Sequence, residues 1–107
     1  MANTEKRRKP RDGHVTLAAD LVIGGAAELH ARLGKALSDP APVVLDAAAV
    51  ARLDTCGLQL LLAFVQARNA DGHPWRWENV GGGLRDAAAL LGMQGMLELP
   101  DAIPAHD

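Results

Sequence analysis

Residues 42–64 read PVVLDAAAVARLDTCGLQLLLAF, and this stretch decides the fold. Val43 to Leu45 is a short apolar run between chain breakers, which is typical of a strand buried on both faces. Asp54 and Thr55 then precede a long apolar run, as expected where a helix begins. The stretch therefore predicts a central strand, a short turn and an apolar helix with the hydroxyl of Thr55 at its N-terminus.

The N-terminus of that helix is a favourable place for negative charge. Its first amides have no partner within the helix, and the helix dipole adds partial positive charge there. A phosphorylated Thr55 would be stabilised by both effects. A threonine beside an aspartate is also typical of a simple helix cap, which contributes about 1 kcal/mol. Spacing alone favours the cap.

Strands and helices alternate around this stretch. Residues 14–18 alternate polar and apolar side chains, which predicts a strand that residues 21–23 continue after a turn. From residue 26 to residue 37 apolar side chains recur at spacings of three and four, which predicts an amphipathic helix. Residues 75–78 predict a strand with one wet face, and residues 84–91 a third helix. This order indicates an α/β domain with a largely parallel sheet, and it leaves antiparallel pairing of the opening strands open.

Length and composition favour one soluble domain. The chain has 107 residues, of which 49% are hydrophobic and 22% charged, and this suits a single core. Its one cysteine, Cys56, has no partner for an internal disulfide, and no secretory signal pattern precedes the domain, so we expect a cytoplasmic protein. The longest apolar run, residues 58–65, is far shorter than the ~20 residues that cross a bilayer, so no transmembrane segment is expected.

Charge is uneven along the chain. Residues 1–12 hold five basic and two acidic side chains, which leaves six basic and 11 acidic side chains from Gly13 onward. A negative body is not expected to bind nucleic acid. We expect a basic disordered tail over residues 1–12, a folded domain over 13–99 and a loose C-terminal tail over 100–107.

The residues that catalysis or metal binding would need are not grouped in the sequence. None of the four histidines, His14, His30, His73 and His106, has a credible partner for a hydrolase, and no Cys/His/carboxylate cluster has metal-ligand spacing. The glycine run 81–83 lacks the lysine of a P-loop, which favours a turn. The sequence therefore predicts no enzyme, no cofactor and no metal site.

The helix that begins near Thr55 has a second apolar side, formed by Leu60, Ala63, Phe64 and Ala67. Two alternatives remain open for it. A neighbouring helix covers this side, or Leu60 and Phe64 contact a partner protein. A weak homodimer is also left open.

Several motifs resemble the STAS domain family, which includes anti-sigma factor antagonists and the STAS subunit of Mla phospholipid-transport systems. Leu45-Asp46 followed by residues 53–58, LDTCGL, is similar to the family's most specific pattern, and Ala19 to Ile23 is similar to its G-E-L-D element except at Val22. The resemblance covers about residues 14–99. It implies a four- to five-stranded, mostly parallel sheet with helices largely on one face.

The resemblance also implies a role for the start of the helix. In antagonists the regulatory hydroxyl follows the aspartate, which carries over to Thr55 as a phosphorylation site, with Asp54, Thr55, Cys56 and Gly57 as partner-binding residues. The implied function is non-enzymatic signal transduction by partner switching, with an anti-sigma factor or serine-kinase-like protein as partner. The alternative is a constitutive subunit that braces the ATPase of an ABC-type phospholipid transporter.

Overall fold

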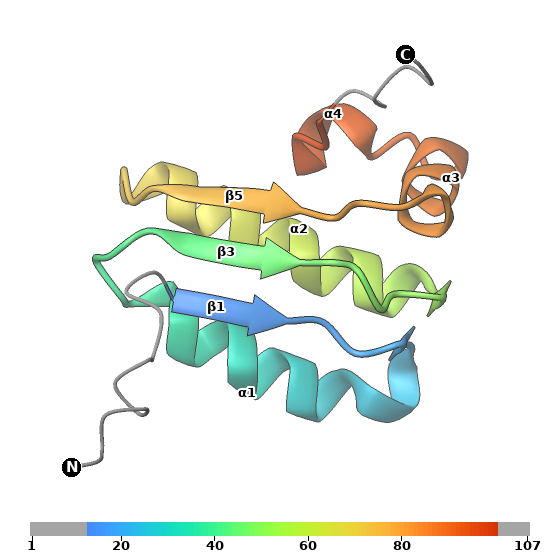
Figure 1. The fold of residues 1–107 in the computed structure, drawn as a ribbon, viewed down its shortest axis with the longest axis horizontal. Helices are drawn as coiled ribbons and strands as arrows, with labels where there is room; N and C mark the ends of the chain where they lie inside the picture. The colour runs from blue at the N-terminus through green and yellow to red at the C-terminus, as the bar shows by residue number, and fades with distance from the viewer. Residues whose placement is uncertain (1–12, 101–107) are drawn as a thin grey trace, which may run out of the picture.

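Three parallel strands form the main sheet of the computed structural model, which describes residues 13–100. They are β1 (Gly13–Thr16), β3 (Val43–Asp46) and β5 (Trp75–Glu78), in the order β1-β3-β5 (Figure 1). The first three residues of β3 are at most 2% exposed, which the apolar run without polar alternation requires. The prediction of a central strand is therefore confirmed.

A second, smaller sheet pairs β2 (Asp20–Leu21) with β4 (Arg52–Leu53), also in parallel. The α/β fold with five mostly parallel strands is confirmed, but the strands are divided between two sheets. The carbonyl of Ala19 accepts hydrogen bonds from the amides of residues 51 and 52, so the turn after β1 leads the chain away from β3 and toward β4. For this reason the opening strands do not pair with each other in antiparallel fashion.

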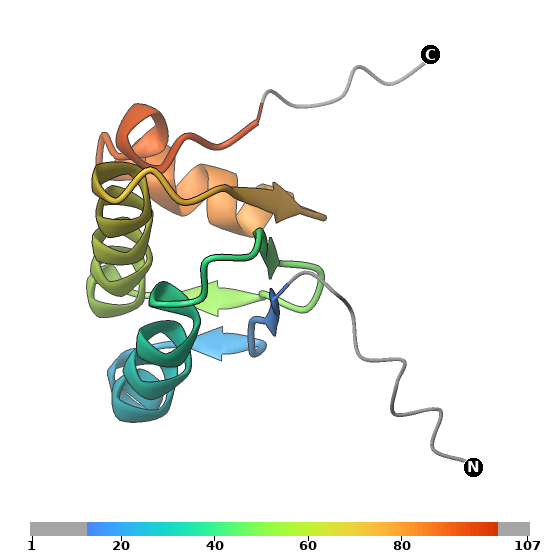
Figure 2. The ribbon, with the colours of Figure 1, turned by 90° about the vertical axis from the view of Figure 1, so that its left-hand side faces the viewer.

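The helices lie largely on one face of the main sheet, as expected. α1 (Ala26–Leu37) follows a short 3-10 turn, η2 (Ile23–Gly25), and packs beside α2 (Thr55–Ala70). Figure 2 shows both helices on the same side of the sheet, with α4 (Gln94–Leu97) beyond α2. α3 (Gly82–Leu90) follows β5 and packs against β4. The core between the sheet and the helices consists mainly of leucine and valine.

One buried charge joins the helix layer to the loops beside the end of α2. Arg68, in the last turn of this helix, is 0% exposed. Its guanidinium donates hydrogen bonds to five carbonyl oxygens, those of Ala36, Leu37, Asp39, Ala41 and Pro74. Burial lowers the pKa of Arg68, and the nearby Asp39 and Asp71 raise it. The cation also lies at the C-terminus of α1, where a helix dipole favours positive charge.

Candidate functional site

The first turn of α2 lies beside the carboxyl ends of the strands in both sheets. Because all the strand pairs within residues 13–100 are parallel, the loops that follow the strands meet at this end of the sheets, on the right in Figure 1. Binding sites of open α/β sheets are formed at this end. The topology therefore places the residues predicted around Thr55 where loops from several strands converge.

Asp54 is the N-cap of α2 and fixes the local geometry. One carboxylate oxygen, Oδ1, accepts a hydrogen bond from the amide of Gly57 at 3.0 Å, and the other, Oδ2, accepts one from the amide of Ile23 at 2.9 Å. The hydrogen bond from Gly57, followed by that from Ile23, lowers the pKa of Asp54 below its usual value. The ionised carboxylate thus joins the loop before α1 to the first turn of α2.

Thr55 is the first residue of α2 and its side chain is exposed. Because Asp54 supplies the cap, the hydroxyl of Thr55 is not needed for it. Within residues 13–100 the hydroxyl has no hydrogen-bond partner. At this point the helix cap is therefore Asp54 and not Thr55, and the side chain of Thr55 is exposed.

Gly57 is required by a close approach of the backbone. A Cβ atom at this position would lie 2.2 Å from the carbonyl oxygen of Leu21, the last residue of β2. The amide of Asp54 donates to that same carbonyl at 3.2 Å. Cys56, between Thr55 and Gly57, is half-buried. The end of β2 and the first turn of α2 are thus packed together with no room for a side chain.

Ile23 adds an apolar group that the sequence interpretation did not include. It is 73% exposed, and its amide is held by the same carboxylate that caps α2. The signal that could have identified it is an isoleucine directly before two glycines, in a loop where a solvated residue would be expected. Ile23 thus adds an exposed apolar side chain to the turn that Asp54 joins to the start of α2.

The second apolar side of α2 is covered in part by α1, and Ala63 on this side remains exposed. Phe64 is 3% exposed and belongs to the core, and Leu60 is half-buried. A narrow groove of about 100 Å³ remains between the two helices. It is lined by His30, Leu33, Gly34, Leu37, Leu60, Ala63 and Phe64. Of the two alternatives for this side, coverage by a neighbouring helix is the one observed for Phe64.

One histidine does have a carboxylate partner, which corrects the expectation from the sequence. The Nε2 atom of His14 lies 3.2 Å from Oδ2 of Asp46 on the face of the main sheet that α1 and α2 leave uncovered. The side chain of Asn79 and the amide of Ala48 also donate to Asp46, and these two bonds lower its pKa. The pairing was not foreseen because the two positions are 32 apart in the sequence.

Two further properties concern the described part of the chain. Within residues 13–100 no group of three or more His, Cys, Asp or Glu side chains is placed to hold a metal ion. None of the helices there is long and apolar enough to cross a membrane.

Comparison with known proteins gives one family and one fold. The sequence model of a family described as the Mlab STAS domain matches residues 4–98. Among solved structures, a sulfate transporter family protein from Wolinella succinogenes is similar with a TM-score of 0.68 and 21% identity, over 88% of this chain and 78% of that one. At this identity the similarity concerns the fold. None of the curated proteins matches.

Proposed function

The chain belongs to the STAS family described as the Mlab STAS domain, and we propose that it is a non-enzymatic module that binds a partner protein through the N-terminus of α2. The observation that carries the proposal is the exposed hydroxyl of Thr55, left without a capping role by Asp54. The exposed Ile23 lies on the loop that the same carboxylate holds. Together they form a docking surface, defined here as Ile23 and residues 54–57.

The chemistry of the docking surface suits a desolvated protein contact. Ile23 provides apolar area, and Thr55 provides a group that both donates and accepts hydrogen bonds. The backbone beneath them is fixed by Asp54 and by the close contact at Gly57. A surface that is ordered before binding loses little conformational entropy when a partner arrives.

We propose a constitutive partner as the first candidate, namely the ATPase of an ABC-type phospholipid transporter in the cytoplasm. The match to the family described as Mlab supports this choice. In this role Thr55 is a permanent contact. The module would brace the ATPase and would not take part in its chemistry.

Partner switching is the second candidate, and the accessibility of Thr55 favours it. A kinase can reach an exposed hydroxyl, and phosphorylation would add a charge of about −1.5 to −2. The helix N-terminus tolerates that charge in the free protein. Inside a desolvated contact beside ionised Asp54 the same charge would be repelled, so the partner would be released.

Photo-crosslinking in the native cell tests the proposal and distinguishes the two candidates. A photoreactive residue at position 55 should crosslink to one protein, and the same residue at Asp71, exposed at the other end of α2, serves as the matched control. An ATPase crosslinked from position 55 alone supports the constitutive role. A kinase or an anti-sigma factor supports the switch. Equal crosslinking from both positions would show that the docking surface is not specific.

A further inference from the structure

The outer edge of β5 is unpaired in the described structure. β5 is the last strand in the order β1-β3-β5, and its hydrogen bonds to β3 run from the carbonyl of Pro74 to that of Glu78. In a parallel pair, every second residue of a strand bonds to the neighbouring strand, and the residues between them direct their N–H and C=O groups away from that neighbour. The N–H and C=O groups of Trp75 and Trp77 therefore point outward, and none of these groups has a partner among residues 13–100.

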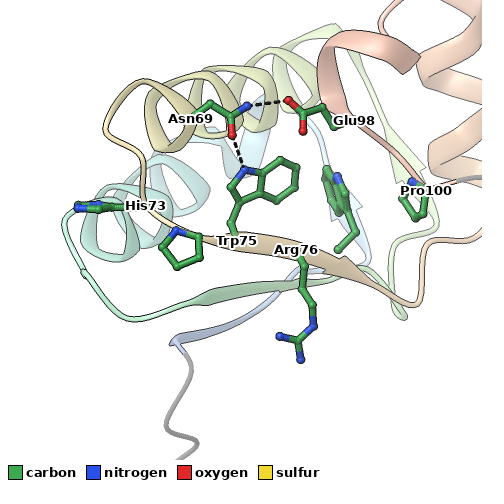
Figure 3. A pocket seen from close by; sticks show the side chains of 8 residues that line it. Asn69, His73, Trp75, Arg76, Glu98 and Pro100 are labelled. Carbon is green, nitrogen blue, oxygen red and sulfur yellow. Dashed lines mark hydrogen bonds between the residues drawn. The ribbon is translucent and has the colours of Figure 1, made fainter.

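A groove of about 450 Å³ lies along this edge (Figure 3). Five consecutive residues, 73–77, form one wall, and Asn69, Glu98 and Pro100 form the other. The volume is within the range of binding sites. Because an extended chain advances about 3.3 Å per residue, the first wall is roughly 16 Å long. A long groove beside a free strand edge suits an extended segment of polypeptide.

The helical side of the groove is ordered by a chain of hydrogen bonds. The indole Nε1 of Trp75 donates to the side-chain oxygen of Asn69 at 2.9 Å, and the Asn69 amide donates to Glu98 at 2.7 Å. Trp77 packs at 83° to Trp75 with 6.0 Å between ring centroids, and its own indole donates to the carbonyl of Leu97. These side chains hold their positions before a ligand arrives, which lowers the entropic cost of binding.

The charge of the groove favours a cation. Glu98 is exposed, its hydrogen-bond partner is the neutral Asn69, and it takes part in neither of the ion pairs found within residues 13–100. Arg76, which also lines the groove, is paired with Glu78 at 2.9 Å. Glu98 thus places a carboxylate close to the indole of Trp75. An aromatic face beside a carboxylate attracts the side chain of lysine or arginine.

We propose that β5 accepts an extended segment of a partner protein as a further strand, with a lysine or arginine side chain placed between Trp75 and Glu98. Addition of a strand to a free sheet edge is a recurrent mode of peptide recognition. The groove is separate from the docking surface, because Asn69 and Thr55 are about 20 Å apart along α2. The proposal of strand addition at β5 can therefore fail or succeed independently of the proposed function.

Backbone NMR with short peptides tests both parts of the proposal on the full chain. The probe is an acetylated and amidated peptide of alternating valine and lysine, and glutamate replaces lysine in the control peptide. The lysine peptide should shift the amide signals of Trp75 and Trp77 and the indole signal of Trp75. The glutamate peptide should bind about tenfold more weakly. N-methylation of the peptide amides that face β5 should abolish binding, whereas methylation of the alternate amides should not.

Two variants test whether the carboxylate of Glu98 causes the preference for the lysine peptide. Glu98→Gln retains an acceptor for Asn69 and should remove the preference for lysine over glutamate. Asp86→Asn, at an exposed position on α3, removes a carboxylate outside the groove and should leave the preference unchanged. The proposal is overturned if the lysine peptide shifts neither tryptophan amide, or if both methylated peptides bind alike. It is also overturned if the shifts follow protein concentration without peptide, which would assign this edge to a second copy of the chain.

Discussion

Opposite charges hold α2 near its two ends, and only the charge near the last turn is fully buried. At the first turn the carboxylate of Asp54 accepts two amides, and the neighbouring Thr55 is exposed. Near the last turn the guanidinium of Arg68 donates to five carbonyl oxygens and is 0% exposed. The carboxylate of Asp54 orders the exposed first turn, whereas the buried guanidinium of Arg68 joins α1, α2 and the loops into one fold.

This contrast separates the energetics of folding from those of binding. Hydrogen bonds to a buried charge are costly to lose, because the partner groups are left without water. The side chain of Thr55 is exposed, so water replaces what a substitution at this one position removes. Changes near Arg68 should therefore alter the free energy of unfolding, and changes at Thr55 should alter partner affinity alone.

The largest effect is expected at Arg68. Arg68→Ala removes the donor of five carbonyl oxygens and opens a cavity where the buried side chain was, so it should lower the free energy of unfolding by about 4 kcal/mol. Arg68→Lys keeps a charge but fewer donors and should lose less. Urea denaturation followed by circular dichroism measures both variants. A loss below about 1 kcal/mol for Arg68→Ala would mean that the loops do not depend on this side chain.

The next largest effect is expected from a pair of helical glycines. Gly57→Ala places a Cβ atom against the Leu21 carbonyl and should cost about 3 kcal/mol. A Cβ atom at Gly34, inside α1, would meet nothing within 4 Å beyond its own helix, so Gly34→Ala should stabilise the protein by about 0.5–1 kcal/mol. Thermal unfolding of the two variants side by side provides the comparison. Equal melting temperatures would contradict the close packing at the start of α2.

A smaller effect, with a defined pH dependence, is expected at Asp54. Asp54→Asn keeps one acceptor oxygen where the carboxylate has two, so one of the two amides loses its partner, and the loss should be smaller than for Gly57→Ala. The pKa of Asp54 lies below its usual value of 3.8 in the folded protein. Its stabilisation is therefore complete above that value and is lost as the pH falls through the folded pKa. The urea midpoints of the unmodified protein and Asp54→Asn should differ at about pH 7 and converge as the pH falls through the folded pKa of Asp54.

The sequence predicted the elements that are determined by interactions between neighbouring residues. The apolar run at Val43 to Leu45 identified the central strand, and the polar pair at Asp54 and Thr55 identified the start of α2, because burial and capping act on neighbouring residues. The division into two sheets was not foreseen. It depends on which later strand each opening strand meets, and this is a property of the whole chain.

Two residues that the sequence interpretation missed, Arg68 in α2 and Ile23 in η2, show the same limit. Arg68 continues the buried spacing of Leu58, Leu61 and Val65, so its position in the core had a signal in the sequence, but the carbonyl groups that it joins lie up to 32 residues away. Ile23 was missed as a surface residue because its amide is held by Asp54, which is 31 residues away. Long-range hydrogen bonds of this kind leave no periodic pattern.

The smallest effect on stability and the largest on binding should coincide at Thr55, and one paired measurement tests this. The affinity for the partner captured from position 55 is measured for the unmodified protein, Thr55→Ser and Thr55→Glu, together with the free energy of unfolding of each. Thr55→Glu should weaken binding more than about tenfold, and Thr55→Ser should retain it. All three unfolding free energies should agree within about 0.5 kcal/mol. A Thr55→Glu protein that is equally stable and binds as tightly as the unmodified one would contradict the account.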